Sequence, residues 1–153
     1  MNGGEHEISS GNSELAFFIA KYDNNANLIW AKTMSGNGTG TGNLISIDEK
    51  GDIYAVGTFS GTIQFETQSM TAASVENTDN FLVKYAADGS MVWARSLKGS
   101  KLDDINAMDV ANHQVVIGGV IRSEDLAVDN APGILMKTLD TTGTVSYTHL
   151  RAH

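Results

Sequence analysis

The sequence predicts an all-β fold made of repeated four-stranded antiparallel sheets. The first observation is internal similarity: the stretch 81–95 repeats the stretch 18–32, and Lys84 follows Lys21 at a spacing of 63 residues. Self-similarity at a fixed spacing is the signature of a repeat architecture. The second observation is that no window shows the 3.6-residue apolar period of a helix. The chain is therefore expected to consist of similar β units.

Each of these two stretches has the pattern of a β-hairpin. Apolar and β-branched residues flank polar turns at 24–27 and 87–90, and Gly, Asn and Asp tolerate the backbone angles that tight turns need. The arms do not alternate, since Phe81, Leu82 and Val83 follow one another directly. A continuous apolar run is typical of a strand that is covered on both faces. We therefore expect each hairpin to lie between neighbouring sheets.

A second type of hairpin separates these copies, at 44–59 and again at 107–121. Here Asp48 matches Asp109 and Gly57 matches Gly118, both at a spacing of 61 residues. One unit is therefore two hairpins, or four short strands, in about 60 residues. The positions that recur, which we expect to be structural, are Lys21, Tyr22, Trp30, Asp48, Gly57, Lys84, Tyr85, Trp93, Asp109, Gly118 and Lys137.

Small sheets of this kind bury their faces only by stacking, as the blades of a β-propeller do. The chain is expected to hold about two and a half such blades. The boundaries predicted from the repeats are a half blade at 14–35, a full blade at 43–98 and a partial blade at 104–144.

Two segments carry a family resemblance. The segment 79–95 is similar to D-x-F-V-A-K-Y-D-x-x-G-N-x-x-W-A, and 45–62 is similar to I-A-x-D-x-x-G-N-x-Y-V-T-G-x-F. Both patterns belong to the bacterial seven-bladed β-propeller repeat, which the chain resembles over residues 15–143. A third copy begins at residue 134, 53 residues after the second, and it departs from the pattern, with Thr138 in place of the tyrosine. The resemblance implies four-stranded antiparallel blades in a secreted or surface protein, and it carries over no catalytic residue.

The two ends of the chain do not fit the repeat. Residues 1–13 are polar and rich in Gly, Ser and Asn, and we expect a flexible lead-in. The repeat calls for a tryptophan at position 146, where Ser146 stands. The segment 145–153 resembles a translated transposase adapter of a sequencing library, and we expect it to be a non-native tail.

The composition excludes several classes of function. The formal net charge of −8 argues against a nucleic-acid partner, which a basic surface would attract. No window approaches the roughly 18 consecutive apolar residues of a membrane span. The absence of cysteine excludes disulfides and thiolate metal sites. Residues 1–7 lack the pattern of a signal peptide, so an extracellular or surface location is implied by the resemblance alone.

Motifs for cofactors, metals and nucleophiles are incomplete. The glycine-rich stretch 35–42 fits neither a dinucleotide-binding nor a P-loop pattern, and we expect a loop. Asp23–Asn27 begins like a calcium loop, but the sixth and twelfth positions are Leu28 and Met34, so a hairpin turn is the better interpretation. Ser60 is one position too late for a nucleophile elbow. We expect no cofactor, metal or catalytic residue in this part of the protein.

Two interpretations of the repeated side chains stay open. The lysines could pair with Asp48 and Asp109 at a seam between blades, and the tryptophans could pack between blades or stack on sugars. Adjacent carboxylates at Asp103 and Asp104 are weak candidates for a binding surface on a loop face. We expect a non-catalytic structural or interaction module with a protein or glycan partner. The alternative is a set of blades from a quinoprotein-like or carbohydrate-active enzyme whose active site lies elsewhere.

Overall fold

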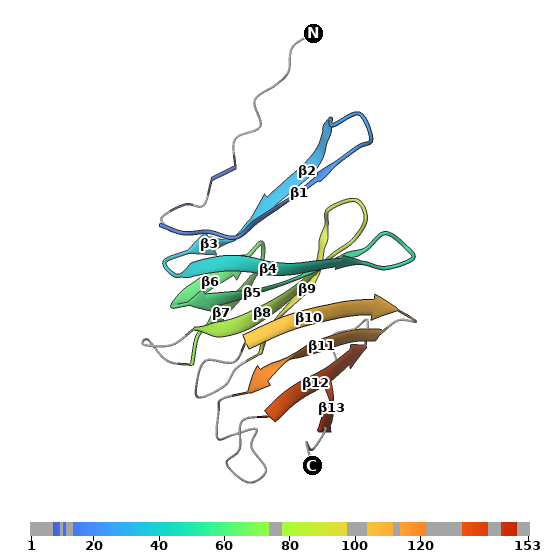
Figure 1. The fold of residues 1–153 in the computed structure, drawn as a ribbon. Helices are drawn as coiled ribbons and strands as arrows, with labels where there is room; N and C mark the ends of the chain where they lie inside the picture. Colours follow the sequence, from blue (N-terminus) through green and yellow to red (C-terminus); the bar gives the residue numbers. More distant parts are fainter. Residues whose placement is uncertain are drawn as a thin grey trace.

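The computed structural model describes residues 8–9, 11, 14–73, 78–97, 104–111, 114–121, 133–140 and 145–149, with position 121 and the last two ranges described by their backbone alone. Within these residues there are thirteen strands and no helix (Figure 1). Every strand pair is antiparallel. The all-β antiparallel prediction is confirmed.

The central sheet joins the two predicted types of hairpin. Its strands are β4 (Thr39–Ile47), β5 (Ile53–Ser60), β8 (Asp79–Tyr85) and β9 (Met91–Leu97), in that order across the sheet. The hairpin β4–β5 therefore pairs with the hairpin β8–β9 through β5 and β8. One unit of the repeat is one four-stranded sheet.

Another four-stranded sheet of the same order, which we call the third sheet because it holds the third copy of the repeat, follows along the chain. It contains β10 (Asp104–Ala111), β11 (Gln114–Ile121), β12 (Gly133–Asp140) and β13 (Val145–His149). The backbone of β13, which belongs to the segment expected to be a non-native tail, pairs with β12 as a fourth strand. The DNA origin of that segment remains a prediction.

The first hairpin stands alone as a two-stranded sheet, formed by β1 (Phe18–Tyr22) and β2 (Leu28–Thr33). A small sheet lies beside it, with β6 (Thr62–Phe65) between β3 (Ser35–Gly36) and β7 (Gln68–Thr71). Neither type of predicted hairpin includes β6 or β7. Their alternate residues Ile63 and Phe65 are fully buried, which explains why this connection is ordered as a hairpin.

The prediction of a loop over the glycine-rich stretch 35–42 is wrong, because β3 and the first part of β4 occupy it. The absence of side chains is what allows neighbours to pack on this strand. A Cβ at Gly40 would lie 2.6 Å from the sulfur of Met34, and a Cβ at Gly42 would lie 2.8 Å from the ring of Phe17. Glycine here permits close packing against the strand.

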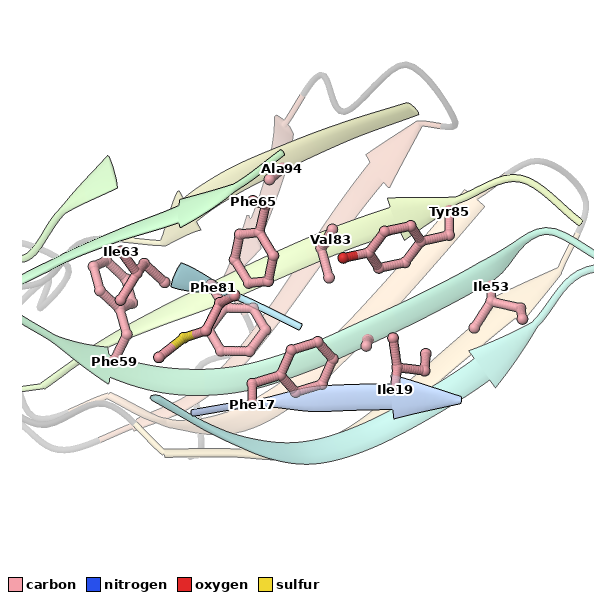
Figure 2. Close-up of a cluster of buried hydrophobic side chains, with 12 residues drawn as sticks. Phe17, Ile19, Ile53, Phe59, Ile63, Phe65, Phe81, Val83, Tyr85 and Ala94 are labelled. Atoms are coloured by element: carbon pink, nitrogen blue, oxygen red, sulfur yellow. The ribbon is translucent and has the colours of Figure 1, made fainter. Parts of the chain in front are cut away.

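Two apolar cores lie on the two faces of the central sheet. The first core fills the space between this sheet, the first hairpin and the small sheet, and the second lies between this sheet and β10–β11. Figure 2 shows the rings of Phe17, Phe65 and Phe81 converging in the first core, with ring centroids 5.1 to 5.9 Å apart.

Strand β5 shows how one strand serves both cores. Ile53 and Ala55 belong to the first core, whereas Tyr54 and Val56 belong to the second. All four are buried. Burial of each large apolar side chain contributes about 1.5–3 kcal/mol relative to exposure. The prediction that the hairpins at 18–32 and 81–95 lie between neighbouring sheets is confirmed for 81–95, where β8 is buried throughout. It is wrong for 18–32, because one face of β1 is exposed.

The repeat extends to irregularities in strand pairing. The hairpins β1–β2 and β8–β9 both have a bulge next to the repeated lysine, where Ile29 and Val92 are the extra residues. The hairpins β4–β5 and β10–β11 both have a bulge at an asparagine, Asn43 in β4 and Asn106 in β10. Each pair is 63 residues apart. Bulges are designed features of a fold, so this coincidence supports a true structural repeat.

Candidate functional site

The densest group of polar side chains lies beside the turn between β4 and β5. The ammonium Nζ of Lys84 lies 2.8 Å from the carboxylate Oδ2 of Asp52 and 5.0 Å from the ring centroid of Tyr54. The hydroxyl of Tyr54 donates a 3.3 Å hydrogen bond to Asp48 Oδ2. We call Asp48, Asp52, Tyr54 and Lys84 the polar cluster.

The strands hold the polar cluster in place. Lys84 lies opposite Tyr54 on one side and opposite Trp93 on the other, so the three side chains form a row on one face of the sheet. The rings of Tyr54 and Trp93 meet edge to face at 6.1 Å. The lysine is only 6% exposed. A buried ammonium is tolerated when it is paired with a charge and held against a ring, and both conditions are met here.

Burial raises the pKa of the Tyr54 hydroxyl, and the nearby ammonium of Lys84 only partly offsets this effect. For Lys84 the burial alone would lower the pKa, but the hydrogen bonds and the charges of Asp52 and Tyr54 raise it above its ordinary value. A nucleophilic lysine needs a lowered pKa. The polar cluster therefore keeps a protonated lysine and a neutral tyrosine, which suits a structural role.

The expected pairing with Asp48 and Asp109 is not found for Lys21 and Lys84, whereas the side chain of Lys137 lies outside the described residues. Asp48 accepts hydrogen bonds from the backbone N–H groups of Lys50 and Asp52 at 2.9 Å each, and so closes its own turn. Asp109 lies within β10, where its Oδ1 accepts from the N–H of Val110 at 2.9 Å. The sequence showed two aspartates at equal spacing, but only the structure shows which carboxylate faces the lysine.

Lys21 and Trp30 carry the contact between the first hairpin and the central sheet. The Nζ of Lys21 and the indole Nε1 of Trp30 both donate to the backbone carbonyl of Ala87, at 2.8 and 3.3 Å. The ring of Trp30 also lies 6.0 Å from that of Tyr85. These side chains pack between sheets, and Gly89 lies against the ring of Trp30, which favours packing over sugar stacking.

A glycine lies beside the bulge in both the central and the third sheet, but the residue that matches Gly57 in the structure is not Gly118. Gly57 lies opposite Gly42 beside the bulge in β4, and Gly119 lies opposite Ile105 beside the bulge in β10. A Cβ on Gly57 would collide with the carbonyl oxygen of Thr41, and one on Gly119 would collide with that of Asp104. The structural counterpart of Gly57 is therefore Gly119.

Lys137 takes a different register from the lysine it matches in sequence. It lies opposite Ile117, whereas Lys84 lies opposite Tyr54. By the bulges, Ile117 is the counterpart of Ala55 rather than of Tyr54, because Gly119 corresponds to Gly57. The third copy therefore places its lysine one position away from the expected one.

The weak binding candidates are Asp103 and Asp104. Asp104 is the first residue of β10 and is exposed, whereas Asp103 lies outside the described residues. Tyr22, on the outer face of β1, is also exposed. The structure therefore places Asp104 and Tyr22 on separate sheets.

The carboxylate of Asp23 forms hydrogen bonds within the turn 23–27. The Oδ1 of Asp23 accepts from the backbone N–H groups of Asn25 and Asn27, and its Oδ2 accepts from the amide of Asn27, all at 2.8 Å. These hydrogen bonds lower the pKa of Asp23. Among the described residues, no group of three or more His, Cys, Asp or Glu side chains has the arrangement of a metal site.

No helix among the described residues has the length and apolar character needed to cross a membrane. Comparison with known proteins gives no assignment, since no protein-family model matches the chain and a search of curated proteins finds no relative.

Proposed function

We propose that the chain is a non-catalytic structural and interaction module, forming about two and a half blades of a β-propeller in a secreted or surface bacterial protein. The observation that carries this proposal is the central sheet, which buries apolar side chains on both faces against sheets of similar sequence. A sheet of this kind has no stable solvent-facing side. It therefore serves best as one member of a series.

The relative placement of neighbouring sheets supports blade-like stacking. β10, the first strand of its sheet, packs on β4, the first strand of the central sheet. Equivalent strands thus lie over one another, as they do when blades surround an axis. The drawing of the fold shows the sheets following one another in chain order (Figure 1).

The polar side chains support a role without catalysis. The polar cluster holds a charged lysine with a raised pKa, and Asp23 and Asp48 satisfy the backbone of their own turns. Ser60 shares a hydrogen bond with Thr39 across the β4–β5 pair, at 2.8 Å. These groups are used in folding, so the loop ends of the sheets are the surfaces that we assign to a protein or glycan partner.

Insertion of one extra unit tests the repeat. A second copy of residues 35–97 placed after Leu97 adds one sheet, and in a repeat protein each unit contacts only its neighbours. We expect far-UV circular dichroism per residue to stay unchanged and the free energy of unfolding to rise. A fall of the signal per residue, with loss of cooperative unfolding, would contradict the proposal.

A glycan array tests the interaction role. We expect saturable binding that weakens in the Asp104→Asn variant. The matched control is Asp88→Asn, because Asp88 is also exposed but lies in the β8–β9 turn, away from the start of β10. Equal loss in both variants would indicate a charge effect rather than a site at β10.

A further inference from the structure

Strand β1 has a partner on one edge only. Its copy in the central sheet, β8, pairs with β9 on one edge and with β5 on the other. Among the described residues, β1 pairs with β2 and with no other strand. An open strand edge offers backbone N–H and C=O groups to an added strand.

Two isoleucines are uncovered on β4. Ile45 and Ile47 are each 59% exposed, although they lie opposite Ala55 and Ile53, which are buried in the first core. They therefore extend the apolar face of the first core beyond the edge of the hairpin that covers it. Such an exposed extension of a core is typical of a surface that another element covers.

The same positions are covered in the third sheet. Counting from the bulged asparagines, Met108 corresponds to Ile45 and Val110 corresponds to Ile47. Val110 belongs to the second core and is only 7% exposed, and Met108 is partly buried against this core. They are covered because a complete four-stranded sheet precedes them. β4 is preceded by the two-stranded sheet alone.

The open edge of β1 and the two isoleucines are adjacent. Trp30 in β2 lies against Tyr85 in β8, whereas Phe17, directly before β1, lies against Gly42 in β4. Strand β2 therefore covers the far strands of the central sheet, and the open edge of β1 faces the side of β4.

We propose that this place, the open edge of β1 together with Ile45 and Ile47, binds an antiparallel β-hairpin with the chemistry of residues 39–60. The hairpin adds to β1 as β5 adds to β8, by backbone hydrogen bonds. Its face equivalent to Leu44, Tyr54 and Val56 covers the two isoleucines, as β4–β5 covers the third sheet. This inference rests on the proposed stack of repeats, and it names the segment that completes the first sheet.

A synthetic peptide of residues 39–60 tests the proposal on the full chain. We expect saturable binding and amide exchange at Phe18–Tyr22 slowed about tenfold. A peptide with Tyr54→Asp and Val56→Asp should not bind, whereas one with Ile45→Thr and Ile47→Thr changes the opposite face and should bind.

Variants of the receiving chain locate the site. Ile45→Asp with Ile47→Asp should abolish peptide binding, and Val92→Asp should not, since Val92 is exposed at a bulge away from β1. Binding that survives the first variant would overturn the proposal. So would amide exchange at Phe18–Tyr22 that the peptide leaves unchanged.

A fused copy keeps the test valid if the free peptide does not form a hairpin. Residues 39–77 are placed directly before Leu15 in place of 1–14, which reproduces the spacing of the repeat. We expect the same protection of β1 and a higher denaturation midpoint. Unchanged exchange at β1 with intact protection of β5 and β8 would overturn this inference alone, whereas loss of protection in β5 and β8 would contradict the stack itself.

Discussion

The indole of Trp30 lies on Gly89, in the turn of the neighbouring sheet. A Cβ added to Gly89 would lie 2.8 Å from the indole ring, and the backbone φ of Gly89 is +89°, in the region that favours glycine. The carbonyl of Ala87 in the same turn accepts the hydrogen bond from the indole. The turn thus contacts and hydrogen-bonds the indole of Trp30. Both the backbone conformation and the close packing favour glycine at position 89.

Gly89→Ala should therefore destabilise the chain. The methyl group meets the indole ring, and alanine at a positive φ costs about 1–2 kcal/mol by itself. We expect a loss of about 2–3 kcal/mol in the free energy of unfolding, measured by urea denaturation. Gly51→Ala is the control for the backbone term, because Gly51 has a φ of +82° but its Cβ would meet only Ala87 at 3.5 Å. Equal losses in the two variants would exclude a packing role for Trp30.

Ala26→Gly should stabilise the chain. Ala26 has a φ of +61° and lies 63 residues before Gly89, in a turn with the same backbone hydrogen bonds. Glycine relieves the left-handed strain, and its greater freedom in the unfolded chain offsets part of the gain. We expect an increase of about 0.5–1 kcal/mol in unfolding free energy. Ala87→Gly, in the corresponding hairpin, is the control and should not stabilise.

Lys84→Met should cost about 2–4 kcal/mol of unfolding free energy, because it leaves the carboxylate of Asp52 without its ion-pair partner. We expect the double variant Lys84→Met with Asp52→Asn to recover most of this loss. Lys21→Met is the matched control, since it removes only a hydrogen bond to a carbonyl and should cost about 1 kcal/mol. A double variant as unstable as the single one would show that the ion pair is not the cause.

Much of this fold follows from the sequence, and what does not follow has a physical reason. The hairpins could be predicted because their turns and continuous apolar arms are local signals. The strand at 39–42 could not be predicted, because the glycines in the sequence do not reveal that the side chains of Phe17 and Met34 pack against them. The connection between the paired residues Val110 and Val115 is one residue shorter than the connection between the paired residues Ile47 and Ile53. The spacing of 61 residues in the sequence therefore matched Gly57 to Gly118, although Gly119 is the residue that takes the same position in the structure.

The polar cluster was only partly predictable for a similar reason. The repeated lysine was evident, but Asp48 and Asp52 are four residues apart on one turn, and the direction of each carboxylate depends on the turn geometry. Asp48 accepts from the backbone of the turn, which leaves Asp52 to face Lys84. Position in a repeat indicates that a residue is structural. It does not indicate the partner.

Stability should fall on acidification through Asp23 and Asp88. Hydrogen bonds within their turns lower the pKa of both carboxyls, to Asn27 for Asp23 and to Ser90 for Asp88. A lowered folded-state pKa contributes stability above the unfolded pKa, and this contribution is lost as the pH falls through the folded value. Chemical denaturation between about pH 7 and about pH 2 measures it.

Asp23→Asn with Asp88→Asn keeps the turn acceptors without the charge. We expect the acid-dependent loss to be smaller in this variant than in the parent chain. Glu49→Gln is the control, because Asp48 and not Glu49 accepts the hydrogen bonds from the backbone of the turn between β4 and β5. An acid dependence that is unchanged in the double variant would assign the effect to other carboxyls.

The outer face of β1 should cause self-association. Phe18 is 66% and Tyr22 is 58% exposed, whereas their counterparts Phe81 and Tyr85 are buried in the first core. Covering such apolar rings gains about 1.5–3 kcal/mol each. We expect oligomers whose mass rises with concentration in light scattering. Phe18→Ser with Tyr22→Ser should shift the population to monomer, and Val92→Ser should not. A compact monomer at every concentration would show that the outer face of β1 is stable without a neighbour. That result would count against the proposed stack of sheets.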